Sequence, residues 1–93
     1  MYLLVSCSEH GCYTPKKRKT YEDAYRWMVE RTANNIRDLY DFVSNDLEAM
    51  SDEEVIEWMK GYSSDFIFTE KHSKIICGDG SFYDRWIFDL DKI

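Results

Sequence analysis

The chain has 93 residues, of which 44% are apolar and 16% aromatic, so it can bury a modest core as one domain, residues 1–93. A net charge of −6 opposes direct binding of nucleic acid, because the phosphate backbone repels it. Neither a membrane span of ~20 apolar residues nor a signal peptide with a basic start is found. An odd number of cysteines, three, fits a reducing compartment, so we expect a cytoplasmic protein with free thiols.

Strand-forming residues open the chain. Residues 2–7 predict a strand, residues 8–11 a turn, and residues 12–14 a second short strand. Pro15 suits the end of an edge strand because it has no amide hydrogen to donate. The basic run 16–19 leads into the next helix. We interpret it as a solubilising run on an edge, with contact to nucleic acid or to a phosphate-rich partner as the alternative.

A long helix is predicted after Thr20, whose hydroxyl can accept a hydrogen bond from the amide of Asp23. Apolar or weakly polar residues then recur in steps of three and four, which is a helical stripe. These residues are Ala24, Met28, Thr32, Ile36, Leu39, Val43, Leu47 and Met50. The unbroken spacing favours a continuous helix over residues 21–49, and a break near Asn34 and Asn35 is the alternative. A continuous helix of ~43 Å protrudes from a domain of this size, and its apolar end then needs a partner.

An acidic segment follows, since residues 38–59 hold eight acidic side chains and no lysine or arginine. Asp38, Asp41 and Glu48, with Asn45 between them, keep helical spacing and lie opposite the apolar stripe. Carboxylates displayed on folded structure predict a docking surface for a basic partner. A solvated helix face is the alternative interpretation.

A second, shorter helix is predicted from Ser51, which forms a capping box with Glu54. Its inward side chains are expected at four positions, and Gly61 is expected to end it. The inward positions are Val55, Ile56, Met59 and Tyr62.

The last third of the chain has strand character. Residues 66–69 and 74–77 predict two strands around a polar turn at residues 71–73, and residues 78–80 predict another turn. In the strand over residues 82–90, Phe82, Trp86, Phe88 and Leu90 share one face. We therefore predict an α+β fold, in which one long and one short helix pack on one face of an antiparallel sheet. The sheet combines an N-terminal strand or hairpin with the C-terminal three-strand meander.

Five side chains are candidates for metal or thiol chemistry: Cys7, His10, Cys12, His72 and Cys77. They could hold zinc if the two hairpins adjoin, or supply a Cys–His nucleophile. The spacing C-x2-H-x-C matches no familiar zinc finger, so we interpret Cys7 and Cys77 as small core residues and His10 as a turn residue. We expect no metal, no cofactor and no catalysis. The carboxylates lie along an outward helix face and not in a shaped pocket, which also favours a protein that is not an enzyme.

The segment HGCYTP (residues 10–15), then basic residues, then TYEDAY (residues 20–25), resembles small acidic proteins of bacterial mobile elements. That group is similar in layout to anti-CRISPR proteins and other phage-encoded inhibitors. The resemblance covers about the first third of the chain. It implies an inhibitor that occupies a surface of a target protein.

The sequence thus predicts a small inhibitor or adaptor whose acidic helical face covers a basic, nucleic-acid-binding surface of another protein. The charge would come from Asp38, Asp41, Glu48, Asp52, Glu53 and Glu57. Tyr40 or Trp58 would be the aromatic anchor. Two alternatives stay open: a homodimer that pairs through the long helix, and a small Cys/His metal-binding protein.

Overall fold

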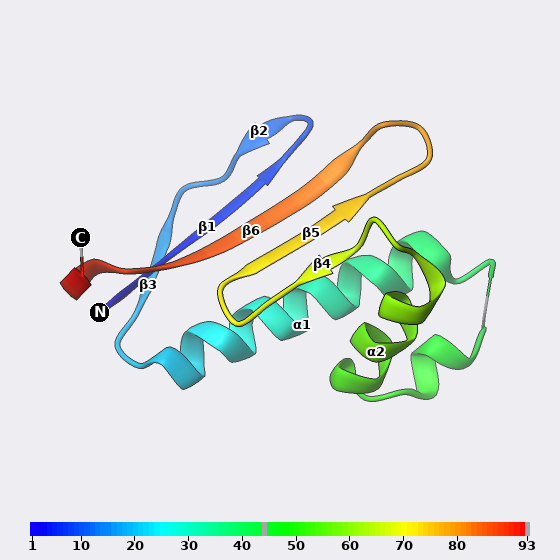
Figure 1. The fold of residues 1–93 in the computed structure, drawn as a ribbon, viewed down its shortest axis with the longest axis horizontal. Coiled ribbons are helices and arrows are strands. Elements are labelled where there is room, and N and C mark those ends of the chain that lie inside the picture. The colour runs from blue at the N-terminus through cyan, green and yellow to red at the C-terminus, as the bar shows by residue number, and fades with distance from the viewer. Residues whose placement is uncertain (44, 93) are drawn as a thin grey trace.

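Two α-helices cover one face of a six-stranded antiparallel sheet in the computed structural model, which describes residues 1–43 and 45–92 and leaves aside the side chain of Asn45 (Figure 1). The strand order is β2-β1-β6-β5-β4, and β3 pairs with β1 along the same edge as β2. The predicted α+β architecture is confirmed.

The helices and strands have the following bounds. The strands are β1 (Tyr2–Ser8), β2 (Gly11–Cys12), β3 (Lys16–Arg18), β4 (Ile67–Phe68), β5 (His72–Ile76) and β6 (Phe82–Asp89). The α-helices are α1 (Tyr21–Tyr40) and α2 (Asp52–Tyr62), and the 3-10 helices are η1 (Asn45–Ala49) and η2 (Leu90–Lys92). Among the described residues, none of the helices combines the length and the apolar character that crossing a bilayer requires.

The strands differ from the prediction at several places. The second strand is Gly11–Cys12 and not residues 12–14. The basic run 16–19 contributes the edge strand β3, in which Lys16 pairs with Leu4 of β1. Lysine has a low strand propensity, so residues 16–18 form a strand because they pair with β1, and their own sequence does not predict it. The turn expected at residues 71–73 lies earlier, because the hydroxyl of Thr69 accepts hydrogen bonds from the amides of Lys71 and His72, and β5 begins at His72.

Helix α1 begins as predicted, with the Thr20 hydroxyl accepting from the Asp23 amide at 3.2 Å. It passes through Asn34 and Asn35 without a break and ends at Tyr40. The predicted helix over residues 21–49 is therefore wrong, and so is the alternative break. Beyond the helix end the chain folds back into η1, which places Leu47 in the core with 1% exposure. The spacing of apolar residues at Leu47 fits a continuing helix, but such a helix would protrude and leave this side chain exposed. When the chain folds back, Leu47 is buried within the same molecule.

Helix α2 has the predicted capping box between Ser51 and Glu54. Val55, Ile56 and Met59 are buried as expected, whereas Tyr62 is 50% exposed, so the inward prediction for that residue is wrong. The prediction for Gly61 is also wrong. It lies inside the helix, and the cap is Ser63, whose amide donates to the Met59 carbonyl at 3.0 Å.

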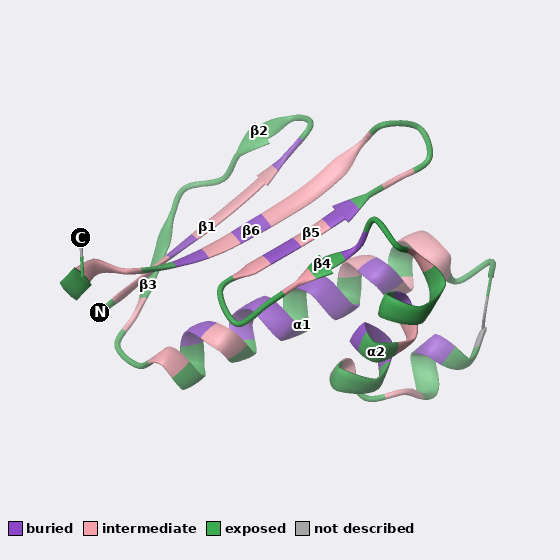
Figure 2. Ribbon diagram, in the orientation of Figure 1, coloured by how far each residue is buried: buried purple, intermediate pink, exposed green. Residues whose placement is uncertain are grey.

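The core lies between α1, α2 and the sheet (Figure 2). One cluster joins the second half of α1 to α2 and to Ile75 of β5, and a second joins the first half of α1 to Leu4 and Ile87 of β1 and β6. A hydrogen bond of 2.7 Å between the hydroxyls of Thr32 and Ser73 crosses this core from α1 to β5.

The opposite face of the sheet is largely apolar, with His72, Lys74 and Asp84 among its polar side chains, and carries no helix among the described residues. In β6, Ile87 faces the helices, whereas Trp86 lies on the open face and stacks on His72 with ring centroids 3.6 Å apart. Phe88, next but one to Trp86, is 39% exposed. The alternation expected along this strand is present, and its aromatic side is turned away from the helices.

Candidate docking surface

Negative charge is concentrated at one end of the molecule. We define the acidic lobe as residues 38–65, which include the end of α1, η1 and α2. It holds nine acidic residues and one basic residue, Lys60, while the rest of the chain holds nine acidic and eleven basic residues. The lobe therefore has a net charge of −8, whereas the rest of the chain has a net charge of +2. All of its acidic side chains except Asp52 are exposed, so they set the potential outside the surface.

The predicted acidic stripe is not carried by one helix. Asp38 lies in α1, Asp41 is the residue after its last turn, and Glu48 lies in η1. The side chain of Asn45, expected between them, lies outside the described residues. The stripe was inferred from a continuous helix, and the fold-back at residue 41 removes that register. The three carboxylates remain exposed on neighbouring elements of the lobe.

Arg37 joins the elements of the lobe to one another. Its guanidinium donates to Asp52 Oδ1 at 2.7 Å and to the carbonyl oxygens of Leu47 and Met50 at 3.1 and 2.7 Å. The side chains of Arg37 and Asp52 are only 15% and 30% exposed. Asp52, a predicted docking residue, therefore holds the fold together. Glu57 accepts from Lys60 Nζ at 2.9 Å on the open surface, where such a pair contributes little.

An aromatic cluster lies within the acidic lobe. We define the aromatic tip as Tyr40, Phe42, Trp58 and Tyr62, which come from the end of α1, the turn after it and the last turns of α2. The rings of Trp58 and Tyr62 stack with centroids 4.9 Å apart, and Tyr40 meets Tyr62 edge-on at 5.4 Å. Phe42 stacks on Tyr40 at 6.4 Å. The four rings thus form one continuous aromatic cluster, and Glu53, Glu54 and Glu57 line a surface hollow together with Trp58.

The two predicted anchors form the base of the tip and not its exposed part. Tyr40 and Trp58 are half-buried and pack against the core, and burial, followed by the neighbouring Cys77 and Tyr62, raises the pKa of Tyr40. The exposed rings are Phe42 at 81% and Tyr62 at 50%, and neither was predicted. A signal was present for Phe42, since it lies off the apolar stripe that enters the core.

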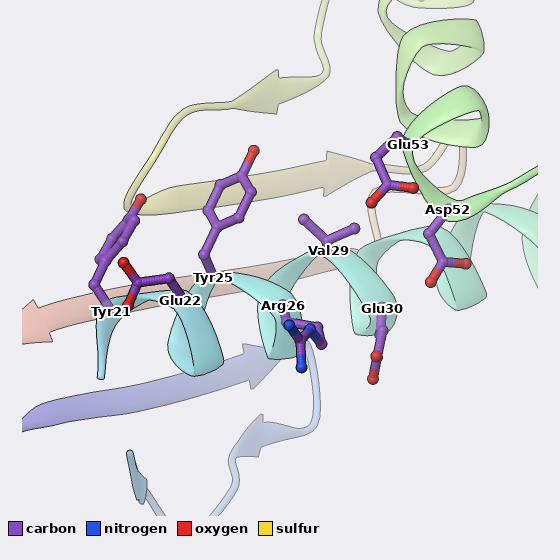
Figure 3. Close-up of a pocket in the computed structure, with 8 residues that line it drawn as sticks. All are labelled: Tyr21, Glu22, Tyr25, Arg26, Val29, Glu30, Asp52 and Glu53. Carbon is purple, nitrogen blue, oxygen red and sulfur yellow. The ribbon is translucent and has the colours of Figure 1, made fainter. Parts of the chain in front are cut away.

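A groove extends the acidic surface along α1 (Figure 3). Tyr21 and Tyr25 of α1 stack along one side of it at 5.8 Å, and Asp52 and Glu53 at the start of α2 close its end. Aromatic faces together with carboxylates suit a cationic side chain, and Arg26 of α1 already lines the groove beside them. Asp52 and Glu53 are the two predicted docking residues that line this groove.

The cysteines and histidines do not gather into one site. Cys7 and Cys12 form a disulfide between β1 and β2, so the expectation of three free thiols is wrong, and Cys77 alone is free. His10 lies in the exposed turn between them, and His72 bonds Asp84 at 2.6 Å on the open face of the sheet. Within residues 1–43 and 45–92, no three His, Cys, Asp or Glu side chains are grouped as metal ligands.

Comparisons with models of protein families, with curated proteins and with solved structures find no match to this chain. Its function is therefore inferred from the acidic lobe, the aromatic tip and the remaining surface features of the chain itself.

Proposed function

We propose that the protein is a small binding module, an inhibitor or adaptor that places its acidic lobe on a basic surface of a target protein. The observation that carries the proposal is the exposure of Phe42 and Tyr62 in the middle of a lobe with a net charge of −8. Solvent-exposed aromatic rings in a part of the chain rich in charge match the composition of binding hot spots.

The two features have separate roles in binding. Carboxylates at Asp38, Asp41, Glu48 and Glu53 attract a basic surface over distances of about 10 Å and accelerate encounter, an effect that salt screens. The tip then supplies contact area that salt does not weaken, because burial of aromatic rings depends on their apolar surface. A complex of this kind should associate more slowly in high salt while its dissociation changes less.

The target that best fits this surface is a protein that itself binds nucleic acid, since a basic surface that attracts phosphate groups also attracts a lobe with a net charge of −8. The resemblance to anti-CRISPR and other phage-encoded inhibitors agrees with an inhibitory role and does not select the target. We place the encounter in the cytoplasm, where the Cys7–Cys12 disulfide would be subject to reduction.

The test is capture of a partner from host lysate by the full chain at low and high salt. One variant reverses three lobe charges, Asp38→Lys, Asp41→Lys and Glu48→Lys. A matched control reverses three exposed charges outside the lobe, Glu9→Lys, Glu70→Lys and Asp91→Lys, and so has the same net charge. A third variant, Phe42→Ala with Tyr62→Ala, removes the exposed rings.

We expect a partner that the control variant retains and that both the lobe variant and the ring variant lose. If the lobe variant and its control lose the partner equally, the interaction depends only on the net charge of the protein. If both retain the partner, the lobe charges take no part in binding. Either result contradicts the proposal.

A second candidate is self-association through the open face of the sheet. Ile67, Ile76 and Phe88 are 39–42% exposed on this face, around Trp86. The long helix, expected earlier to pair with a second copy, buries its apolar stripe against the chain's own sheet and so offers less apolar surface. Light scattering that shows a monomer at high concentration, unchanged by Phe88→Lys, would dispose of this candidate.

A further inference from the structure

Arg85 of β6 is a buried cation without a counter-ion. It is 7% exposed and faces α1, on the same side of the sheet as Ile87. In the described part of the chain, its Nε has no hydrogen-bond partner and no carboxylate lies within ion-pair distance of its guanidinium. A buried guanidinium in this state destabilises the fold unless something pairs with it.

A pocket of about 400 Å³ opens over Arg85. Two further cations line it, Arg31 from α1 and Lys16 from β3, and no acidic side chain does. Pairing of Lys16 with Leu4 turns Lys16 toward the helix side of the sheet, whereas the next residue, Lys17, is turned to the other side. The alternation along β3 therefore places Lys16 at this pocket and Lys17 on the other side of the sheet.

The electrostatics of the pocket favour an anion. Burial, and next the positive charge of Arg31, lower the pKa of Arg85 to about 10, while the tyrosines Tyr13 and Tyr83 oppose that change. A bound anion would offset the repulsion between the guanidinium groups of Arg85 and Arg31 and would accept a hydrogen bond from Arg85 Nε. Three positive charges around one site match a phosphate group, which carries up to two negative charges, better than a single carboxylate.

Asn35 of α1 supplies a second requirement. Its Oδ1 is buried and has no hydrogen-bond partner among the described residues, and it lines the same pocket. This oxygen accepts hydrogen bonds, whereas Arg85 only donates them. A ligand that satisfies both must offer an anionic acceptor at one point and a hydrogen-bond donor at another. The phenol rings of Tyr13 and Tyr83 complete the walls.

We propose that this pocket binds a small phosphate ester that also carries hydroxyl groups, of the sugar phosphate class. The phosphate lies on Arg85 with Arg31 and Lys16 at the mouth of the pocket, and a ligand hydroxyl donates to Asn35 Oδ1. The pocket shares no lining residue with the acidic lobe, so it is a separate site from the proposed docking surface.

The test uses three probes with the full chain: ribose 5-phosphate, inorganic phosphate and ribose. Binding is followed by the amide NMR shifts of residues 13, 35 and 85 and by calorimetry. We expect saturable binding of ribose 5-phosphate, weaker binding of inorganic phosphate, and none of ribose. Absence of saturable binding of both phosphate compounds at concentrations on the order of 10 mM would overturn the proposal.

Variants separate a binding role from a structural one. Arg85→Met should weaken phosphate binding by about tenfold or more while leaving Tm equal or raised, because it removes an unpaired buried charge. Arg31→Met, at an exposed position that keeps the fold intact, should weaken it severalfold. Arg26→Met, which removes an exposed arginine of the same helix outside the pocket, is the matched control and should change nothing.

Asn35→Leu should leave the affinity for inorganic phosphate unchanged and abolish the preference for ribose 5-phosphate. If Arg85→Met and Arg31→Met both bind ribose 5-phosphate with wild-type affinity, the two arginines do not bind the phosphate and the proposal fails. Equal affinity of the wild type for inorganic phosphate and ribose 5-phosphate would overturn the assignment of the hydroxyl contact to Asn35.

Discussion

Arg37 and Asp52 form a half-buried ion pair of 2.7 Å that links the last turns of α1 to the first residue of α2. The same guanidinium donates to Leu47 and Met50 in the segment between these helices. The acidic lobe is therefore held together by the one arginine that directly precedes the acidic segment. A surface rich in carboxylates keeps its shape because a single cation organises its interior.

Replacing Arg37 with methionine should destabilise the protein by about 2–4 kcal/mol, since it removes partly buried charged hydrogen bonds to Asp52 and to two carbonyl oxygens. Urea unfolding measures the difference. Arg26→Met is the control, because the ion pair of Arg26 with Asp23 is exposed and 4.0 Å long, and its change should stay within about 0.5 kcal/mol. Equal effects of the two substitutions would contradict the structural role of Arg37.

The buried hydroxyl pair of Thr32 and Ser73 gives a second prediction. Thr32→Val keeps the shape of the side chain but leaves the Ser73 hydroxyl without this partner, so a loss of about 1–3 kcal/mol is expected. Ser73→Ala should have a comparable effect. The double variant should lose less than the sum of the two, because no orphaned hydroxyl remains. Strict additivity in chemical denaturation would show that the two hydroxyls do not depend on each other.

Features that depend on a few neighbouring residues could be predicted from the sequence. The caps at Thr20 and Ser51 depend on residues three positions away, and the apolar stripe as far as Leu39 follows from helical spacing. The strand character of residues 82–89 follows from their alternation. These local patterns were sufficient for the fold class, because two helices and a set of short strands have few ways to form a shared core.

Features that depend on long-range contacts could not be predicted. The spacing of Leu47 from the preceding apolar residues is compatible with a continuing helix and also with a chain that folds back. The folded-back chain is favoured because it buries Leu47 in one cluster with Val55 and Ile75, which are distant in sequence. The Cys7–Cys12 disulfide requires the register of β1 and β2, and the exposure of Phe42 and Tyr62 depends on how the helices meet. Arg85 looks like a surface residue in the sequence, and its burial appears only once α1 lies over β6.

The disulfide predicts the number of reactive thiols. Without reductant, the unfolded protein should react with one equivalent of a thiol reagent at Cys77, and with three equivalents after reduction. Reduction should lower stability by about 2 kcal/mol, because the short loop between Cys7 and Cys12 is released. Cys77→Ser should give no reactive thiol before reduction. Three reactive thiols in freshly purified, unreduced protein would contradict the disulfide and favour the reduced state expected for the cytoplasm.

The cap of α2 predicts how its stability depends on pH. The carboxylate of Glu54 accepts from the Ser51 amide, and this bond, with that between the Ser51 hydroxyl and the Glu54 amide, completes the cap. Hydrogen bonding to the backbone and then to the side chain of Ser51 lowers the pKa of Glu54 below its ordinary value of 4.5. Because the folded pKa lies below the unfolded one, the carboxylate stabilises the fold above pH 4.5 and this contribution is lost as the pH falls through the folded pKa.

Ser51→Ala removes the side-chain part of this effect and keeps the Ser51 amide, so it should raise the pKa of Glu54 only part of the way toward its ordinary value. It should also cost about 1 kcal/mol of stability at neutral pH. The cost should shrink in acid, where the protonated Glu54 no longer favours the capped helix as strongly. NMR titration of the Glu54 side chain, together with urea unfolding at pH 7 and pH 3, measures both effects. Ser64→Ala, an exposed serine beyond the helix, is the control and should change neither. An unchanged Glu54 titration in Ser51→Ala would show that the two halves of the capping box act independently.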